Sequence, residues 1–174
     1  MQKEKTRTLA LLGICASMAL MLSYLESLLP PLFAAIPGIK LGLPNVVVLF
    51  LLYRLGWKSA AGVSLVRLVV VALTFGNAMT FAYSLAGAVL SLGGMTLLKA
   101  LDRFSTVGVS AVGGILHNLG QILVAMVLLR TAELGYYMIV LSITGTLAGG
   151  LVGLCGGLLL ARLPRGFLEG GKRS

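Results

Sequence analysis

The chain has 174 residues, of which 58% are hydrophobic and only 11% are charged. Soluble domains carry about 25% charged residues, so this composition excludes a soluble globular protein and indicates an integral membrane protein. The formal net charge is +9, but the basic residues recur at the ends of apolar runs, as in membrane helices, which argues against nucleic acid as a partner.

Apolar runs along the chain predict an all-α integral membrane protein with six transmembrane helices in a single membrane domain, residues 1–174. A bilayer is spanned by about 20 apolar residues. The first run is long for the core of a signal peptide and predicts a retained helix. We expect helices at about 8–29, 43–55, 57–75, 78–98, 105–129 and 136–163, the second of them short, followed by a basic cytoplasmic tail at 164–174.

The positions of the basic residues predict the topology. One set of helix ends holds Lys3, Lys5, Arg7, Arg54, Lys58, Lys99, Arg103, Arg162, Arg165, Lys172 and Arg173. The opposite ends hold only Lys40 and Arg130. Because lysine and arginine concentrate on the cytoplasmic side, we expect both termini to be cytoplasmic and the protein to lie in the cytoplasmic (inner) membrane.

Small residues recur on one face of the first and the last helix. The last helix carries Gly145, Gly149, Gly153 and Gly157, and the first carries Ala10, Gly13, Ala16 and Ser17. Such faces allow close helix approach in lipid. They serve either packing within the chain or the docking of a partner protein.

The loop IPGIKLGLPN, residues 36–45, lies on the predicted outer side and contains two prolines and two glycines. Pro44 suits the first turn of the second helix, where a missing N–H costs nothing. Asn45 then begins this helix pointing inward. Lys40 either extends to the lipid headgroups or forms a basic lid over an outward-facing site.

Two ionisable residues, Arg67 and His117, lie in the middle of apolar helices. Each is roughly 10 to 12 residues from the inner end of its helix, so both are about 15–18 Å deep at about 1.5 Å per residue. Intramembrane ionisable groups are costly and are candidates for function. Arg67 either pairs with an acidic residue or binds an anionic ligand such as a phosphate or carboxylate. The acidic candidate is Glu26, but its expected depth in the membrane differs from that of Arg67 by several ångströms.

Polar residues in the fifth predicted helix form a stripe. Ser110, Gly114, His117 and Gln121 share one helical face, and Asn118 flanks it. A polar stripe in lipid must face the bundle interior or water. The stripe is either a structural hydrogen-bond network or the lining of a ligand pocket.

The sequence lacks the residue patterns that several kinds of catalytic and metal-binding sites require. There is one histidine, and Cys15 and Cys155 have no neighbour at metal-ligand spacing, so no metal site is expected. A phosphate-binding G-x-x-x-x-G-K-[ST] loop is missing, and Asp102 is the only aspartate. We therefore do not expect this chain to hydrolyse ATP, to act as a hydrolase, or to bind magnesium and diphosphate through the aspartate clusters that prenyl-chain synthases use. We predict a protein that is not itself an enzyme and has no intrinsic cofactor.

Four stretches resemble the Gx transporter family, also known as heptaprenyl diphosphate synthase component I. They are PGIKLGLPN (37–45), SLVRLVVVALTFGN (64–77), FAYSLAGAVLSL (81–92) and VSAVGGILHNLGQ (109–121). This family is similar to the substrate-binding S components of energy-coupling factor transporters. Where the family's loop has alanine, this chain has Pro44.

The resemblance implies an S-component-like bundle of six helices with a small-molecule site that opens outward. The ligand-binding residues it suggests, together with those above, are Lys40, Asn45, Arg67, Tyr83, Ser84, His117, Asn118 and Gln121. It also implies docking of a membrane coupling subunit with two cytoplasmic ATPases onto Ala10, Gly13, Ala16 and Ser17.

Three hypotheses follow. The leading one is a binding subunit that imports a small anionic or amphipathic metabolite. The second is a non-catalytic accessory subunit of heptaprenyl diphosphate or quinone biosynthesis, or of flavin-based electron transfer, with a bound flavin, quinone or prenyl ligand. The third is a structural protein whose polar stripe only locks helices together.

Overall fold

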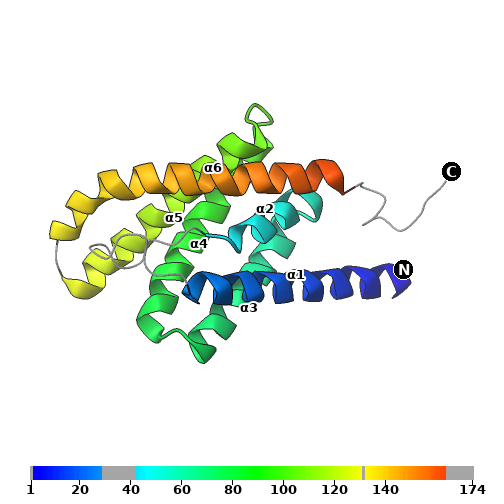
Figure 1. The fold of residues 1–174 in the computed structure, drawn as a ribbon, viewed down its shortest axis with the longest axis horizontal. Helices are drawn as coiled ribbons and strands as arrows, with labels where there is room; N and C mark the ends of the chain where they lie inside the picture. Colours follow the sequence, from blue (N-terminus) through cyan, green and yellow to red (C-terminus); the bar gives the residue numbers. More distant parts are fainter. Residues whose placement is uncertain (1, 29–41, 131, 164–174) are drawn as a thin grey trace.

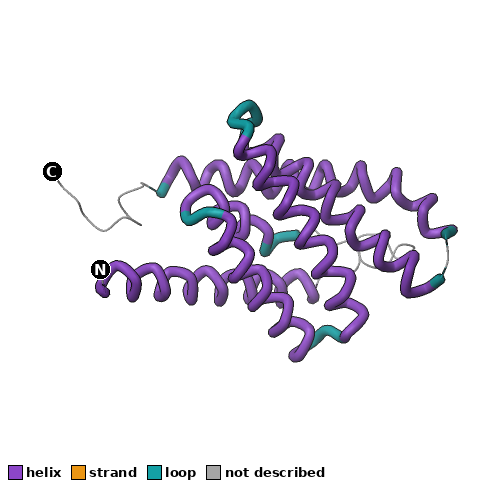
Figure 2. Tube along the Cα trace, turned by 180° about the vertical axis from the view of Figure 1, so that it is seen from behind, coloured by secondary structure: helices purple, strands orange, loops and turns teal. Residues whose placement is uncertain are grey.

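The computed structural model describes residues 2–28, 42–130 and 132–163. This part of the chain forms the helices α1 (Gln2–Leu28), α2 (Asn45–Arg54), α3 (Trp57–Thr74), α4 (Ala78–Ala100), α5 (Thr106–Leu129), η1 (Glu133–Tyr137, a 3-10 helix) and α6 (Met138–Arg162). Figure 2 shows helices joined by short turns throughout these ranges.

The six predicted helices are confirmed, with ends that agree within two residues except at the start of α1. Helix α1 begins six residues earlier than predicted because its first residues, QKEKTR, contain no proline or glycine and include strong helix formers. The prediction did not separate η1 from α6.

Local signals in the sequence set several helix boundaries. The Asn77 side chain accepts a hydrogen bond from Thr80 N at 2.8 Å and caps α4. Ser105 does the same for α5 through Gly108 N at 3.1 Å. Between α2 and α3 the backbone turns at Gly56 with φ of +87°, a conformation that glycine adopts without steric cost.

Five of the six helices predicted to span the membrane have the length and composition that a span requires. Within the described ranges, α1, α3, α4, α5 and α6 with η1 are long and apolar enough to cross a membrane, whereas α2 is not. Ten residues of α2 extend about 15 Å at 1.5 Å per residue, half of a hydrocarbon core of about 30 Å. Instead, residues 47–52 of α2 are all buried, and the helix packs against α3, α6 and α1.

The longer helices present large apolar side chains outward, as a multi-pass membrane protein requires. Leu73, Val127 and Ile139 are 81%, 76% and 73% exposed. The amino end of α1 and the carboxyl end of α6 lie at the same end of the bundle (Figure 1). This arrangement fits the prediction that both termini share one side of the membrane; the cytoplasmic orientation stays a prediction.

Glycines bring α5 and α6 into direct backbone contact. A Cβ on Gly145 would lie 2.8 Å from Gly114 O, and one on Gly153 would lie 2.7 Å from Val107 Cα. Of the two uses predicted for the glycine face of α6, packing within the chain is therefore correct. Gly157 is the exception, since no atom lies within 4 Å of its Cβ position.

Two basic side chains fix the carboxyl end of α2. Arg54 Nη2 donates hydrogen bonds to Leu160 O, at 2.6 Å, and to Leu163 O at the end of α6. Lys99 Nζ donates to Leu52 O at 2.6 Å and lies over the Tyr53 ring, 5.1 Å from its centroid. These cations satisfy carbonyl groups that helix ends leave without partners.

Candidate functional site

A cavity of about 70 Å³ lies inside the bundle and is lined by residues of all six α-helices. Its volume corresponds to roughly five to seven water-sized spaces. The polar side chains that line it are Ser23, Glu26, Asn45, Arg67, Ser84, Ser91, Ser110, His117, Asn118 and Gln121. Such a concentration of polar groups within a membrane protein marks a candidate binding site.

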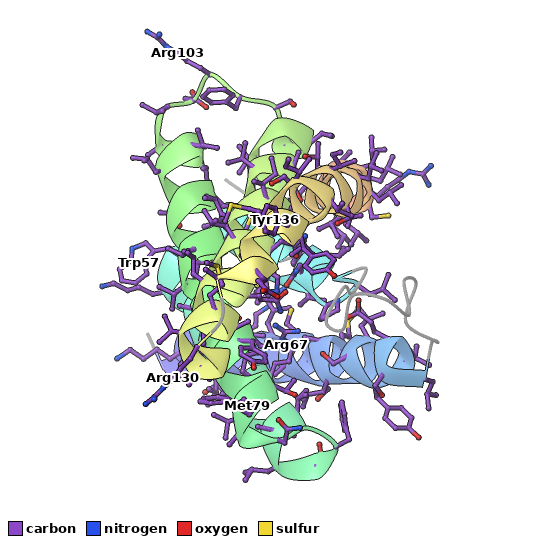
Figure 3. The ribbon with its side chains drawn as sticks, turned by 90° about the vertical axis from the view of Figure 1, so that its left-hand side faces the viewer. Trp57, Arg67, Met79, Arg103, Arg130 and Tyr136 are labelled. Carbon is purple, nitrogen blue, oxygen red and sulfur yellow. The ribbon has the colours of Figure 1, made fainter. Side chains whose placement is uncertain are left out.

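Arg67 is the cation of this site. It lies on α3, is 9% exposed, and occupies the centre of the bundle, whereas Arg103 and Arg130 project from the periphery (Figure 3). Its Nη1 donates a long hydrogen bond to Ser23 Oγ on α1, at 3.4 Å. Its buried Nε has no hydrogen-bond partner among the described residues. The guanidinium thus retains donor capacity beside the cavity.

Glu26 lies one turn beyond Ser23 on α1 and lines the same cavity, with 9% of its surface exposed. Its Oε1 accepts a hydrogen bond from Gly42 N, which joins α1 to the segment that leads into α2. The carboxylate is also near enough to act electrostatically on Arg67. The site therefore combines a cation and an anion.

His117 is positioned by a close contact between α4 and α5. A Cβ on Gly87 would lie 2.7 Å from His117 O and 2.9 Å from His117 Nδ1. A Cβ on Gly120, one turn further along α5, would lie 2.7 Å from Ala86 O. Small residues on both helices therefore allow the imidazole to sit between them at the cavity wall.

Asn118 lines the cavity and also makes a hydrogen bond between two helices. Its Nδ2 donates to Leu141 O of α6 at 2.7 Å, so the amide connects α5 with α6. A hydrogen bond between membrane helices contributes about 0.6–2 kcal/mol. Asn118, which flanks the polar stripe of α5, thus connects two helices and also lines the cavity, while the use of the stripe to bind a ligand stays a prediction.

Six of the eight predicted ligand-binding residues line this one cavity: Asn45, Arg67, Ser84, His117, Asn118 and Gln121. Tyr83 is half-buried but does not line it. Lys40 lies outside the described residues. Whether these residues bind a ligand stays a prediction.

Among the polar side chains of the lining, the predicted site and the predicted stripe of α5 left out three, Ser23, Glu26 and Ser91. For Glu26 a signal existed, because it is the only acidic residue in the apolar part of the first predicted helix. Ser23 precedes it by three residues, and therefore shares its face. Ser91 gave no comparable signal.

The predicted docking face of α1 is largely open. Ala10, Gly13 and Ser17 are exposed, no atom lies within 4 Å of the Cβ position of Gly13, and Ala16 is half-buried. Its use as a docking surface stays a prediction. Among the described residues there is no group of three or more His, Cys, Asp or Glu residues that could hold a metal ion.

Comparison with known proteins assigns the chain to a family. The sequence model of heptaprenyl diphosphate synthase component I matches residues 15–159, a range that includes every residue of the cavity lining. No curated protein and no solved structure matches the chain. This multi-pass helical membrane protein therefore belongs to the heptaprenyl diphosphate synthase component I family.

Proposed function

We propose that this protein is a membrane-embedded binding subunit that takes a compact polar molecule with an anionic group into the cavity among its six α-helices. The observation that carries the proposal is Arg67, which is nine-tenths buried and has an Nε without a hydrogen-bond partner in the described part of the chain. A buried donor without a partner costs about 1–3 kcal/mol, and more when it is charged. An anionic ligand removes this cost.

The cavity surroundings support a ligand with several hydrogen-bonding groups. Ser84 and Ser91 on α4 line the same space as Ser110 and Gln121 on α5. Hydroxyl and amide groups both donate and accept, so they orient polar atoms while the arginine neutralises charge. His117 adds a further polar group at the wall.

The size of the cavity limits the ligand. Pockets for drug-sized molecules have volumes of about 300–1,000 Å³, whereas this one has about 70 Å³. The described residues therefore leave no room for a whole flavin, quinone or prenyl chain inside the bundle. A small metabolite fits, and so does the polar head of a larger molecule whose tail lies elsewhere.

As part of the same proposal, the protein acts as an S-component-like subunit in uptake. A coupling subunit with cytoplasmic ATPases would dock on α1, whose face at Ala10, Gly13 and Ser17 is exposed. Reorientation of the bundle would then release the ligand inside. The chain itself has no catalytic role in this proposal.

Native mass spectrometry of the purified protein tests the proposal. We expect a retained small molecule in the wild type, and a loss of about tenfold or more in its occupancy in Arg67→Gln, because hydrogen bonds to charged groups contribute about 1.5–3 kcal/mol. Arg103→Gln is the matched control, since this arginine is exposed and projects away from the bundle. Equal occupancy in all three proteins would contradict the proposal.

The family description favours a second candidate, an accessory subunit of heptaprenyl diphosphate synthesis. In this role Arg67 would hold the polar head of a prenyl or quinone compound. Co-purification of a soluble prenyl synthase, with a bound polyprenyl compound in the mass spectrum, would support this candidate over uptake.

A further inference from the structure

The cavity extends lengthwise along two neighbouring helices, α4 and α5. Its lining on α4 begins at Ser84 and ends at Met95, and its lining on α5 begins at Ser110 and ends at Gln121. The two residues of each pair are 11 positions apart, which corresponds to about 16 Å at about 1.5 Å per residue. The cavity is therefore elongated.

The volume shows that the cavity is also narrow. Its 70 Å³ hold roughly five to seven water-sized groups. Arranged in a single row with about 2.8 Å between oxygen atoms, such a number of waters extends about 14–20 Å. This length agrees with the length of the lining, so the cavity is about one water molecule wide. An extended, unbranched chain fits such a space, and a branched molecule does not.

Arg67 belongs to the end of the cavity that Ser84 lines. It is seven residues before the end of α3 at Thr74, and Ser84 is six residues after the start of α4 at Ala78. Because a short turn joins these two packed helices, both residues lie about 9–11 Å along their helices from that turn. The cation of the site is thus far from the opposite end, at Met95.

Two serine hydroxyls and a thioether form that opposite end. A Cβ on Gly113 would lie 2.7 Å from Met95 Sδ and 3.2 Å from Ser91 Oγ, so both atoms lie close to this glycine. Ser110 precedes Gly113 by three residues and therefore shares its face of α5. Ser91 and Ser110 line the cavity and are 7% and 3% exposed.

Both of these hydroxyls are free to bind a ligand. Neither has a hydrogen-bond partner among the described residues, whereas Thr96 Oγ1, on the same helix as Ser91, donates to Leu92 O at 2.7 Å. Hydroxyls in helices commonly bond in this way to a carbonyl of the preceding turn. A buried hydroxyl without a partner is unfavourable, and a polar group of a ligand removes that cost.

From this arrangement we infer that the ligand is an unbranched monoanion with an uncharged hydrogen-bonding group, such as a hydroxyl, at its far end. The anionic group lies on Arg67, the far group binds Ser91 and Ser110, and Met95 limits the length of the molecule. This inference rests on the proposed function and deepens it by naming the class of ligand.

The length of the cavity gives the size of the probe. Of about 16 Å, contacts of about 3 Å at each end leave roughly 10 Å for the ligand. An extended chain advances about 1.2 Å per bond, since three backbone bonds extend about 3.6 Å. About eight bonds therefore fit, which is close to the length of 6-hydroxyhexanoate.

Three carboxylates test the inference: 6-hydroxyhexanoate, its branched isomer 2-ethyl-2-hydroxybutanoate, and heptanoate, in which a methyl group replaces the terminal hydroxyl. Their dissociation constants are measured by isothermal titration calorimetry on the whole chain in lipid nanodiscs. We expect 6-hydroxyhexanoate to bind at least tenfold more tightly than the branched isomer, and at least threefold more tightly than heptanoate. Equal binding of all three, or tightest binding of the branched isomer, would overturn the inference.

The double variant Ser91→Ala/Ser110→Ala tests the far end of the cavity. We expect it to bind 6-hydroxyhexanoate no more tightly than heptanoate, while its constant for heptanoate stays that of the wild type. Ser142→Ala is the matched control, because this hydroxyl lies outside the cavity lining and donates to Met138 O at 2.7 Å. A preference for the hydroxy acid that survives in the double variant would contradict the assigned role of the serines.

Met95→Ala tests the limit on length. Removal of three side-chain atoms should extend the cavity, so that 8-hydroxyoctanoate binds this variant at least tenfold more tightly than it binds the wild type. Met79→Ala, the same change at an exposed residue in the first turn of α4, should leave the preference for length unchanged. If Met95→Ala does not fold, the same series of chain lengths on the wild type decides the point, and equal binding of the six- and eight-carbon acids would refute it.

Failure of the inference can be distinguished from failure of the proposed function. If the probes bind without regard to shape or terminal hydroxyl, and binding is lost in Arg67→Gln, the anion-binding site stands and the assigned ligand class is rejected. If no probe binds but native mass spectrometry finds another retained anion, the outcome is the same. If no probe binds and no small molecule is retained, both are rejected.

Discussion

Alanine at Gly149 should force α5 and α6 apart. A Cβ at this position would lie 2.5 Å from Ser110 O and 2.9 Å from Ala111 Cα, both of them backbone atoms of α5. Ordinary contacts of a Cβ begin at 3.4 Å. The difference between 3.4 and 2.5 Å, about 0.9 Å, has to come from separation of the two helices, because no flexible side chain is in the way.

The expected cost follows from two opposing effects. Overpacking costs about 1–3 kcal/mol, and the better helix propensity of alanine returns up to about 1 kcal/mol. A net loss of about 1–2 kcal/mol corresponds to a melting temperature lower by about 2–8 °C for a chain of this length. Since Gly149 and Ser110 both line the cavity, ligand occupancy should fall as well.

The neighbouring residue provides a matched control. Gly150→Ala brings the same gain in helix propensity, but no atom lies within 4 Å of its Cβ position. Melting temperatures of both variants and of the wild type, measured by intrinsic fluorescence in one detergent, give the comparison. Equal melting temperatures for the two variants would refute the close packing of α5 against α6.

Three further predictions concern other parts of the bundle. Gly87→Ala should displace His117, whose Nδ1 lies 2.9 Å from the new Cβ, and should weaken ligand binding about tenfold, whereas Gly93→Ala, with no atom within 4 Å, should have no effect on the measured dissociation constant. Arg54→Met should destabilise the carboxyl end of α6 by about 1–3 kcal/mol, because two carbonyl groups lose a charged donor; unchanged amide hydrogen exchange in its last turn would contradict this. Gly13→Leu on the open face of α1 should leave the melting temperature unchanged but abolish co-purification with a coupling subunit, and undiminished co-purification would exclude this face as the docking surface.

The helices could be predicted because few backbone conformations are stable in lipid. Every backbone polar group must find its partner within the membrane, so an apolar run of sufficient length forms a helix. Side-chain caps at Asn77 and Ser105 are readable from the sequence, and so is the turn at Gly56. The polar stripe of α5 had to face inward for the same reason, which placed His117 and Gln121 at the cavity.

Relations between helices could not be predicted in this way. When the depth of each residue in the membrane was estimated by counting along its helix, Glu26 and Arg67 came out at different depths. That estimate takes no account of helix tilt or of the packing of α1 against α3. In the structure Ser23 bonds to Arg67 and Glu26 lines the same cavity. The sequence likewise allowed α2 to be a full span, while its ten residues form a buried interior helix held by Arg54 and Lys99.

The amino-acid sequence was enough to predict a multi-pass helical membrane protein with an intramembrane arginine and a polar stripe, because the cost of burying polar groups in lipid acts on each segment separately. Which groups meet is seen only in the folded bundle, where the glycines of α6 pack on α5 and where Arg67 and Glu26 line one cavity. These contacts depend on the relative depth, rotation and distance of helices that are far apart in the chain, and no local pattern in the sequence encodes those three quantities.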